Sequence, residues 1–260
     1  MNIYVITHKK FNRKYIQGKK IYKPLLVGVD CGNKGEETYL SDNKGENISY
    51  KNKSYCELTG IYWIWKNSSE DIVGIDHYRR YFVKNRLTKS LLTENDISNA
   101  LAQNDIVLPK KDPTIYNGET AADFFGDCHD PAVWNLIENT IKEMYPAYVK
   151  DFNWYSKQTT GYCYNMFIAH AELINQYNEW LFSILQEIES KVDFEKYDSY
   201  NQRMIGFIAE RLINIWVHHN NLKVKEYPVW YTEKIGLIPK VKNELHKALI
   251  KRRLRKNTQV

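Results

Sequence analysis

Short apolar runs alternate with helical patterns along the first 111 residues. Four apolar runs have the length of buried strands: residues 3–6, 24–30, 72–75 and 105–111. Residues 54–67 carry apolar side chains on one helical face, with Ser54 and Glu57 spaced as a capping box, and residues 95–103 form a second helical pattern. Alternating strands and helices predict an α/β domain whose mainly parallel central sheet is flanked by helices.

The second half of the chain has longer helical patterns. Residues 162–170 are expected to form a strand leading into a helix that ends near Leu185. Residues 201–219 predict another helix, and residues 222–233 a late strand. The polar stretch from Cys31 to Lys53 is a long loop, and such length indicates function or mobility. With no repeat or linker visible, we predict one domain over residues 1–239 and a separate tail over residues 240–260.

Composition narrows the class of protein. The chain has 260 residues, of which 43% are hydrophobic and 14% aromatic, including 20 Tyr, which suits a folded protein with a groove for rings or sugars. No apolar run approaches the roughly 20 residues of a membrane span. The N-terminus lacks a secretory pattern, so we expect a cytoplasmic protein. The four Cys form no CxxC pair, which argues against a zinc site or a disulfide framework.

Positive charge is concentrated at the C-terminus. The chain has a formal net charge of +6, and residues 240–260 hold eight Lys or Arg against Glu244 alone. Apolar residues of this tail share one helical face: Val241, Leu245, Ala248 and Leu249. A basic helix of this kind can lie in a membrane interface, so we expect the tail to bind an anionic membrane surface at the inner face of the cell membrane. The alternative is a disordered, solubilising tail. Nucleic acid is not expected as a partner, because its binders spread basic residues over a folded face.

A cluster of ionisable residues follows the strand at residues 72–75. Asp76, His77, Arg79 and Arg80 lie at its carboxyl end, where open α/β sheets bind ligands. Arginine guanidinium groups match phosphate oxygens. Asp76 could bind a metal ion or a sugar hydroxyl, and His77 could do either or donate to phosphate. The alternative is a set of ion pairs that fixes the edge of the sheet.

Isolated polar residues give further candidates. Thr7 and His8 end the first strand, where a base or ribose commonly docks. Lys110 follows the strand at residues 105–111 and could face a diphosphate, and Asn165 could bind a sugar hydroxyl. Each has a structural alternative, namely a surface histidine, a solvated lysine or a turn asparagine. The chain contains no GxGxxG, Walker loop, GxSxG, HExxH or Asp-x-Asp motif, which disfavours the cofactor and hydrolase classes that these motifs mark.

Six segments in this order resemble one family. They are IYVITHKKF, LSDNKGENISYKNKSYCELTGIYWIWKN, DIVGIDHYRRYF, DIVLPKK, YCYNMFIAHAELINQYNEWLFSIL and RMIGFIAERLINIWV. They resemble the bacterial capsular-polysaccharide and O-antigen glycosyltransferases long catalogued as a domain of unknown function, some of which are galactofuranosyltransferases. The resemblance covers residues 1 to about 232, and CELTxxYWxWKN followed by HYRRYF is its most specific part.

The resemblance implies a GT-A-like fold that binds a nucleotide sugar. A sugar, either galactofuranose or another hexose, would pass from a UDP-sugar to a lipid-linked oligosaccharide at the cytoplasmic face of the membrane. Arg79 and Arg80 would lie near the phosphates. The alternative is a non-catalytic scaffold that binds nucleotide or carbohydrate in a polysaccharide assembly complex.

An inverting mechanism would also require a base for the acceptor hydroxyl. The carboxylate candidates for this base are Asp76, Glu57, Asp130 and Glu210, and the His77 imidazole is the alternative that could take the proton. Because Asp-x-Asp is absent, dependence on Mn²⁺ or Mg²⁺ stays open, and Asp76 is the candidate ligand. We expect dependence on metal to be at most partial, with His77 and the arginines supplying part of its charge.

Overall fold

The computed structural model describes residues 1–113 and 115–233, which divide into two compact units. The first unit comprises Met1–Lys111 and Tyr162–Thr232, and the second is built from Asp112–Gly161, with residue 233 assigned to it. The predicted boundary between residues 239 and 240, and the predicted helix of the tail, lie outside the described residues. Both stay predictions.

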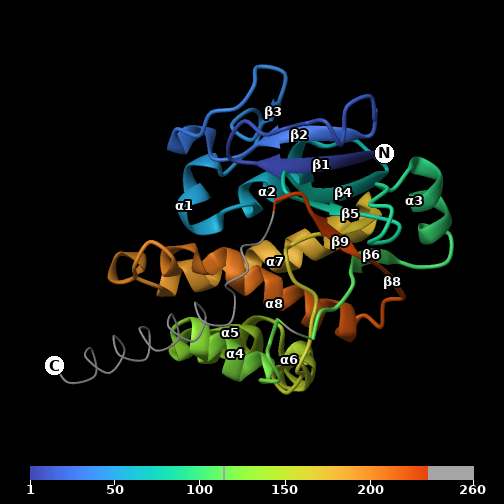
Figure 1. The fold of residues 1–260 in the computed structure, drawn as a ribbon. Helices are drawn as coiled ribbons and strands as arrows, with labels where there is room; N and C mark the ends of the chain where they lie inside the picture. The colour runs from blue at the N-terminus through green and yellow to red at the C-terminus, as the bar shows by residue number, and fades with distance from the viewer. Residues whose placement is uncertain (114, 234–260) are drawn as a thin grey trace. The chain divides into compact units, whose positions relative to one another are not determined.

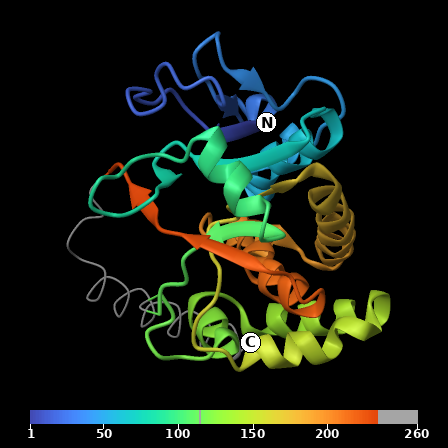
Figure 2. The same ribbon diagram turned by 90° about the vertical axis from the view of Figure 1, so that its right-hand side faces the viewer.

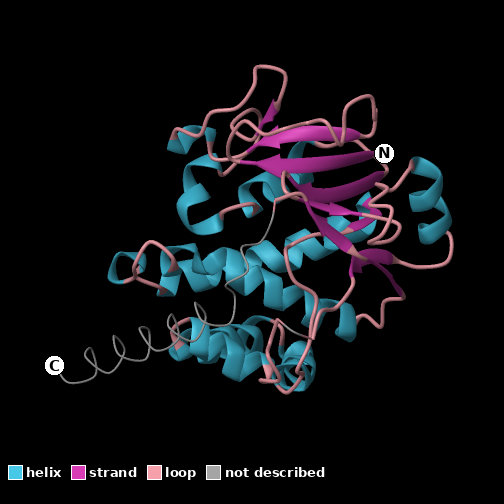
Figure 3. Ribbon diagram, in the orientation of Figure 1, coloured by secondary structure: helices cyan, strands magenta, loops and turns pink. Residues whose placement is uncertain are grey.

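One mixed sheet forms the centre of the first unit (Figure 1, Figure 3). Its strands are β1 Asn2–Thr7, β2 Tyr22–Leu26, β3 Leu40–Ser41, β4 Ile72–His77, β5 Arg80–Phe82, β6 Ile106–Pro109, β7 Ile168–His170, β8 Val224–Tyr227 and β9 Val229–Tyr231. The order is β3-β2-β1-β4-β7-β6-β8, and β5 joins β4 to β9. The strands β3, β2, β1 and β4 are parallel, whereas β7 runs antiparallel to β4 and β6. The carboxyl ends of β1, β2 and β4 therefore meet at one edge.

Helices flank this sheet, so the predicted α/β class is confirmed. The α-helices of the first unit are α1 Asn52–Tyr55, α2 Leu58–Asn67, α3 Glu94–Leu101, α7 Ala171–Lys191 and α8 Met204–His219. Its short 3-10 helices are η1 Val29–Cys31, η2 Ser49–Lys51, η4 Phe194–Lys196 and η5 Asn201–Arg203. The helix α2 packs closely on the sheet at Gly60, where a Cβ would come within 2.7 Å of the Val27 Cγ1.

The predicted helix over residues 54–67 is broken at Cys56. This residue has φ 52° and ψ −125°, so α1 ends at Tyr55 and α2 starts at Leu58. The predicted capping box is wrong: the Ser54 hydroxyl donates to the Lys51 carbonyl at 3.3 Å, and Glu57 makes no side-chain cap to α2. The break leaves the Glu57 carboxylate available for contacts outside its own helix.

The long polar loop between Cys31 and Lys53 is fixed by a buried carboxylate. The Asp42 Oδ2 accepts hydrogen bonds from the Gly28 amide at 2.8 Å and the Thr59 hydroxyl at 2.7 Å, and its Oδ1 accepts from the Ser49 hydroxyl at 2.6 Å. Asp42 is fully buried. Charge-assisted bonds of this kind tie the loop to the ends of β2 and α2.

The second unit is helical. It contains α4 Ala121–Cys128, α5 Pro131–Met144, the 3-10 helix η3 Pro146–Tyr148 and α6 Val149–Ser156. Trp134 packs against Phe125 and Phe152, and the buried Tyr116 and Tyr155 hydroxyls lie 2.5 Å apart. Within the described residues of the whole chain, no helix combines the length and hydropathy that crossing a membrane requires.

Candidate functional site

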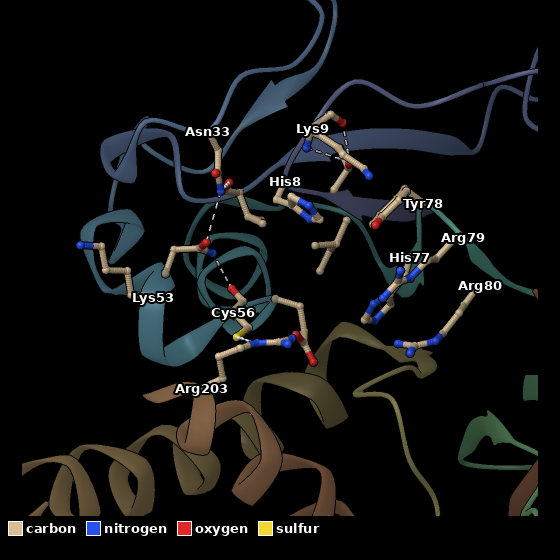
Figure 4. Close-up of a pocket in the computed structure, with 15 residues that line it drawn as sticks. His8, Lys9, Asn33, Lys53, Cys56, His77, Tyr78, Arg79, Arg80 and Arg203 are labelled. Atoms are coloured by element: carbon tan, nitrogen blue, oxygen red, sulfur yellow. Dashed lines mark hydrogen bonds between the residues drawn. The ribbon is translucent and has the colours of Figure 1, made fainter. Parts of the chain in front are cut away.

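A pocket of about 530 Å³ opens at the carboxyl edge of the sheet (Figure 4). It is lined by the ends of β1 and β4 and the residues that follow them. The chain adds β2 and β3 on one side of β1 and then returns to place β4 on the other side, so the strand order reverses between β1 and β4. Ligands of open α/β sheets bind where the strand order reverses in this way. The position predicted from the sequence for a binding site therefore coincides with a pocket.

The lining of the pocket is strongly basic. It contains five Lys or Arg side chains: Lys9, Lys53, Arg79, Arg80 and Arg203. Among the described residues that line it, Glu57 is the one carboxylate. A concave surface with one sign of charge concentrates ligands of the opposite sign, and guanidinium groups bind phosphate oxygens in pairs. The arrangement suits an anionic ligand such as a diphosphate.

Thr7 and His8 both line the pocket from the end of β1. The Thr7 hydroxyl donates to the Lys9 carbonyl at 2.6 Å and accepts from the Lys9 amide at 3.2 Å, so it closes a local turn. His8 is exposed and meets the Tyr78 ring edge-on, with ring centroids 5.4 Å apart. Partial burial, together with the charges of Lys9 and Arg79, lowers the pKa of His8, so its imidazole is neutral near pH 7.

His77 also lines the pocket, as predicted for the end of β4. Its side chain is only 8% exposed, and its Nε2 has no hydrogen-bond partner in the part of the chain that the structure describes. Burial lowers the pKa of His77 to about 4, although the Glu57 charge acts in the opposite direction. At neutral pH the ring is therefore uncharged and adds no positive charge to the pocket.

Asp76 lies on the other face of β4. It pairs in register with Val5 of β1, whereas His77 pairs with Ile6, and only the second pair lines the pocket. Asp76 is fully buried, and its Oδ1 accepts from the Phe82 amide at 3.1 Å while its Oδ2 has no partner among the described residues. Burial raises the pKa of this carboxyl well above its usual value. The geometry thus separates Asp76 from the ligand site.

The two arginines of the predicted cluster are held differently. Arg79 is exposed and lies 5.5 Å from the Tyr78 ring. The Arg80 guanidinium lies 4.9 Å from the centroid of Tyr164 and 5.6 Å from that of Tyr231. Two such cation–π contacts restrict the Arg80 side chain and orient it before a ligand arrives.

A left-handed turn at Tyr164 and Asn165 supports three groups of the pocket. The φ angles of these residues are 81° and 48°. The Asn165 Nδ2 donates to the Glu57 Oε1 at 2.8 Å and to the Gly206 carbonyl at 3.1 Å. The Asn165 backbone is hydrogen-bonded to His77, and the Tyr164 ring lies beneath the Arg80 guanidinium. Asn165 does not line the pocket itself, and its amide is engaged in holding Glu57.

Three other candidates lie outside the residues that line the pocket. Glu210 of α8 is 3.5 Å from the Arg211 Nη1, and burial raises its pKa although Arg211 opposes the shift. Lys110 is exposed after β6, where its amide donates to the Tyr227 carbonyl at 2.8 Å. Asp130 belongs to the second unit and caps α5, its Oδ1 accepting from the Ala132 amide at 2.9 Å.

The sequence-based prediction missed Arg203, which reaches the pocket from the start of α8 (Figure 4). Its Nε donates to the Cys56 Sγ at 3.2 Å. The missed signal was its position: the dipole disfavours a cation at the N-terminus of a helix, so an arginine there suggests another use. Asn33, in the loop that Asp42 organises, was also missed as a pocket residue, and Asn52 at the start of α1 lines the pocket too.

No metal centre is formed by the described side chains. Among them, no group of three or more His, Cys, Asp or Glu is placed to hold a metal ion. Asp76 is fully buried and does not line the pocket, so it does not fit as a ligand of a metal ion there. The cationic groups that line the pocket are the Lys and Arg side chains named above.

Comparisons with known proteins agree with this geometry. Residues 2–221 match the family model described as a domain of unknown function, DUF4422. The apo structure of WbbM, a bifunctional glycosyltransferase, matches with a TM-score of 0.80 at 30% sequence identity. The match covers 90% of this chain and 45% of WbbM, so the chain spans less than half of that protein. No curated protein matches the chain.

Proposed function

The chain belongs to the DUF4422 family, and from this premise we propose that it is a glycosyltransferase acting on a nucleotide-diphosphate sugar. The observation that carries the proposal is the basic pocket at the carboxyl ends of β1 and β4. When a glycosidic bond to a diphosphate breaks, negative charge grows on the leaving phosphates, and fixed cations stabilise it. The 30% identity to a bifunctional glycosyltransferase over 90% of the chain supports the same class.

The donor in this proposal is a UDP-sugar, with galactofuranose or another hexose as the transferred group. Arg79, Arg80 and Arg203 bind the diphosphate, and His8 and Tyr78 contact the nucleoside from the end of β1 and β4. These five side chains line one pocket, so a single ligand can touch them all. Asn165 acts indirectly, through the Glu57 carboxylate that its amide holds at 2.8 Å.

Glu57 is the proposed general base. It is the carboxylate at the pocket, and its one-sided hydrogen bond to Asn165 leaves the other oxygen for an acceptor hydroxyl. His77, with a pKa of about 4, is a weak base at neutral pH and instead acts as a neutral hydrogen-bonding group. Asp76 takes no part in the proposed chemistry, because it is buried on the opposite face of β4 and does not line the pocket.

The charge of the pocket also bears on metal dependence. We propose that arginines take over part of the role that Mn²⁺ or Mg²⁺ has in metal-dependent transferases. Turnover in the presence of a chelator should then fall by no more than a few-fold. Complete loss, restored by Mn²⁺, would contradict this part of the proposal and point to a ligand set completed by the bound donor.

The acceptor is proposed to be a lipid-linked oligosaccharide of capsule or O-antigen synthesis at the cytoplasmic membrane face. The support is the basic tail, which could hold the protein at an anionic leaflet. Truncation after Pro239 should strongly reduce flotation with anionic vesicles if the tail is the main tether. Equal flotation of both proteins would show that it is not.

The proposal is tested by measuring donor binding and donor breakdown separately. UDP should raise the midpoint of thermal unfolding more than GDP or CDP, since a ligand that binds only the folded state stabilises it. Slow hydrolysis of UDP-hexose without acceptor should accompany this binding. UDP binding without hydrolysis or transfer across a panel of UDP-sugars would favour the non-catalytic scaffold, and no nucleotide binding would reject both.

A further inference from the structure

The loop between β5 and α3 holds a leucine out in water. Leu87 is 94% exposed. Within the loop, the Asn85 Oδ1 accepts from the amides of Leu87 at 3.1 Å and Thr88 at 2.8 Å. At its base the Lys84 amide donates to the Ser90 carbonyl at 2.9 Å. These hydrogen bonds give the loop a defined shape that presents Leu87 rather than burying it.

The surroundings of Leu87 are basic. Residues 83–90 contain Lys84, Arg86 and Lys89 and no acidic residue. Residues 1–29 hold seven Lys or Arg and likewise no Asp or Glu, and most of these lie in the loop between β1 and β2. Lys84 is paired with Asp96 at 2.8 Å, whereas Lys19, Arg86 and Lys89 form no ion pair within the described residues. Their charge is available to an external anion.

The two loops share one hollow with the end of the sheet. A cavity of about 400 Å³ is lined by Lys19 and Tyr15 of the first loop, Lys89 of the second and Trp230 of β9. The Tyr15 and Trp230 rings meet edge-on with centroids 4.6 Å apart, and the Lys89 Nζ lies 5.5 Å from the Trp230 ring. In Figure 2 the loop before α3, drawn in teal, projects beside the orange-red β9.

We propose that these residues form a second membrane-docking surface, within the folded unit, for an anionic lipid bilayer. The docking surface consists of Tyr15, Lys19, Arg86, Leu87, Lys89 and Trp230. Leu87 enters the headgroup and acyl boundary, the aromatic rings lie at the interface, and the basic side chains bind lipid phosphates. The exposed Leu87 favours lipid over an anionic glycan, because its side chain is buried among acyl chains in a bilayer but would stay in water beside a hydrated glycan.

This surface is distinct from the tail. It belongs to the first unit, and its contacts do not require the proposed transfer reaction. A bilayer contact by one basic segment alone is marginal and salt-sensitive, whereas two separate contacts hold a protein much more firmly. The docking surface would therefore fix how the unit faces the bilayer, in addition to the affinity that the tail provides.

Hydrogen exchange of the full-length protein tests the proposal at the level of individual segments. Vesicles with about one third phosphatidylglycerol in phosphatidylcholine should protect residues 84–90 and 13–20, while pure phosphatidylcholine vesicles should not. Protection measured segment by segment separates this surface from any contact made by the tail. Absence of vesicle-dependent protection in these segments would overturn the proposal.

Variants of the same full-length chain provide the second measurement. Leu87→Ser should lower partitioning onto the anionic vesicles about fivefold, through loss of one inserted apolar side chain. Combined Lys19→Glu, Arg86→Glu and Lys89→Glu should lower it by about tenfold or more. Lys44→Glu, an exposed lysine outside the surface, is the matched control and should change it little. All variants should keep the wild-type unfolding midpoint and UDP-hexose hydrolysis.

Two outcomes would contradict the membrane assignment. If the variants partition as the wild type does, the docking surface does not contact lipid. If vesicles leave residues 84–90 unprotected while oligogalacturonate protects them, the surface binds an anionic glycan instead. Variants that lose vesicle binding but keep UDP-hexose hydrolysis would support the docking surface. If the wild-type protein does not hydrolyse UDP-hexose, that result would count against the proposed function and not against the docking surface.

Discussion

The two faces of β4 differ although their residues alternate along one strand. On one face, His77 lines a basic, water-accessible pocket, and on the other, Asp76 is enclosed by the apolar core beside Phe82. Burial disfavours the charged form of both groups. It raises the pKa of Asp76, whose charged form is the deprotonated carboxylate, and lowers the pKa of His77, whose charged form is the protonated imidazolium.

This contrast shows how to tell a ligand site from a buried polar group. On the pocket face, Glu57 and Arg203 from distant segments line one volume, and Asn165 supports Glu57 from behind it through a hydrogen bond. On the core face, the Asp76 carboxyl accepts a hydrogen bond from the Phe82 amide, and its Oδ2 has no hydrogen-bond partner within the described residues. Substitutions of Glu57, Asn165 or the pocket arginines should therefore change binding or turnover, whereas those of the buried Asp76 and of the buried His77 imidazole should change stability.

The largest effect expected on the pocket face is that of Glu57→Gln. Loss of the base should lower kcat by about 10²–10⁴-fold while UDP affinity stays within a few-fold of wild type. Steady-state transfer kinetics with UDP titrations would measure both. Glu37→Gln, an exposed carboxylate outside the pocket, is the control and should be silent.

Positioning by Asn165 can be separated from catalysis by Glu57. Asn165→Ala should lower kcat more than it raises KM, because the Glu57 carboxylate loses the hydrogen bond that orients it. Asn165→Ala with unchanged kcat would mean that the Glu57 carboxylate does not require this contact. Wild-type kcat in Glu57→Gln would remove Glu57 from the mechanism altogether.

The buried imidazole of His77 should make the stability of the protein depend on pH. The folded pKa of about 4 lies below the unfolded value of 6.5, so the stability that neutral His77 contributes is present above pH 6.5 and is lost as the pH falls toward 4. As the pH falls, the free energy of unfolding of wild type should therefore decrease by up to about 3 kcal/mol more than that of His77→Gln. Denaturant unfolding at pH 7 and pH 4.5 would measure it, and equal pH dependence in both proteins would refute the assignment.

Removal of a pocket arginine is expected to weaken the donor contact. Arg79→Ala, Arg80→Ala and Arg203→Ala should each weaken UDP binding by about 1.5–3 kcal/mol, the range of charged hydrogen bonds. Calorimetric titration gives the affinities, with Lys142→Ala of the exposed face of α5 as the control. Unchanged affinity in all three arginine variants would place the phosphates elsewhere.

The smallest expected effect concerns the core face. The folded pKa of Asp76 lies above its unfolded value of 3.8, so its stability contribution is complete below that value and is lost as the pH rises through the folded pKa. Asp76→Asn should retain the Phe82 hydrogen bond and avoid this loss. At pH 7 it should therefore be more stable than wild type by about 1 kcal/mol or more.

Turnover distinguishes this expectation from a catalytic role. Asp76→Asn should keep kcat within a few-fold of wild type, measured beside the unfolding curves at pH 4.5 and pH 7. A large loss of kcat with unchanged stability would return Asp76 to the pocket chemistry. A stability change with the same size at both pH values would show that its ionisation is not perturbed.

Local patterns in the sequence located four strands and one edge of the site, but not the short strands β3 and β5. Apolar runs located β1, β2, β4 and β6, and the ionisable residues directly after β1 and β4 lie at the pocket. The predicted class is confirmed because burial of an apolar strand is a property of consecutive residues. Successive side chains of a strand point to opposite faces, so the sequence already implies that Asp76 and His77 lie on different faces of β4.

The break at Cys56 and the convergence of the pocket were decided by tertiary structure. A continuous helical pattern over residues 54–67 gave no sign that Glu57 would leave its own helix to accept from Asn165, 108 positions later in the chain. Arg203 and Asn33 likewise come to line the same pocket only after the sheet and α8 have packed together. Apolar periodicity specifies which face of an element is buried, whereas contacts between polar groups distant in sequence depend on how the elements are placed, and no local pattern encodes that placement.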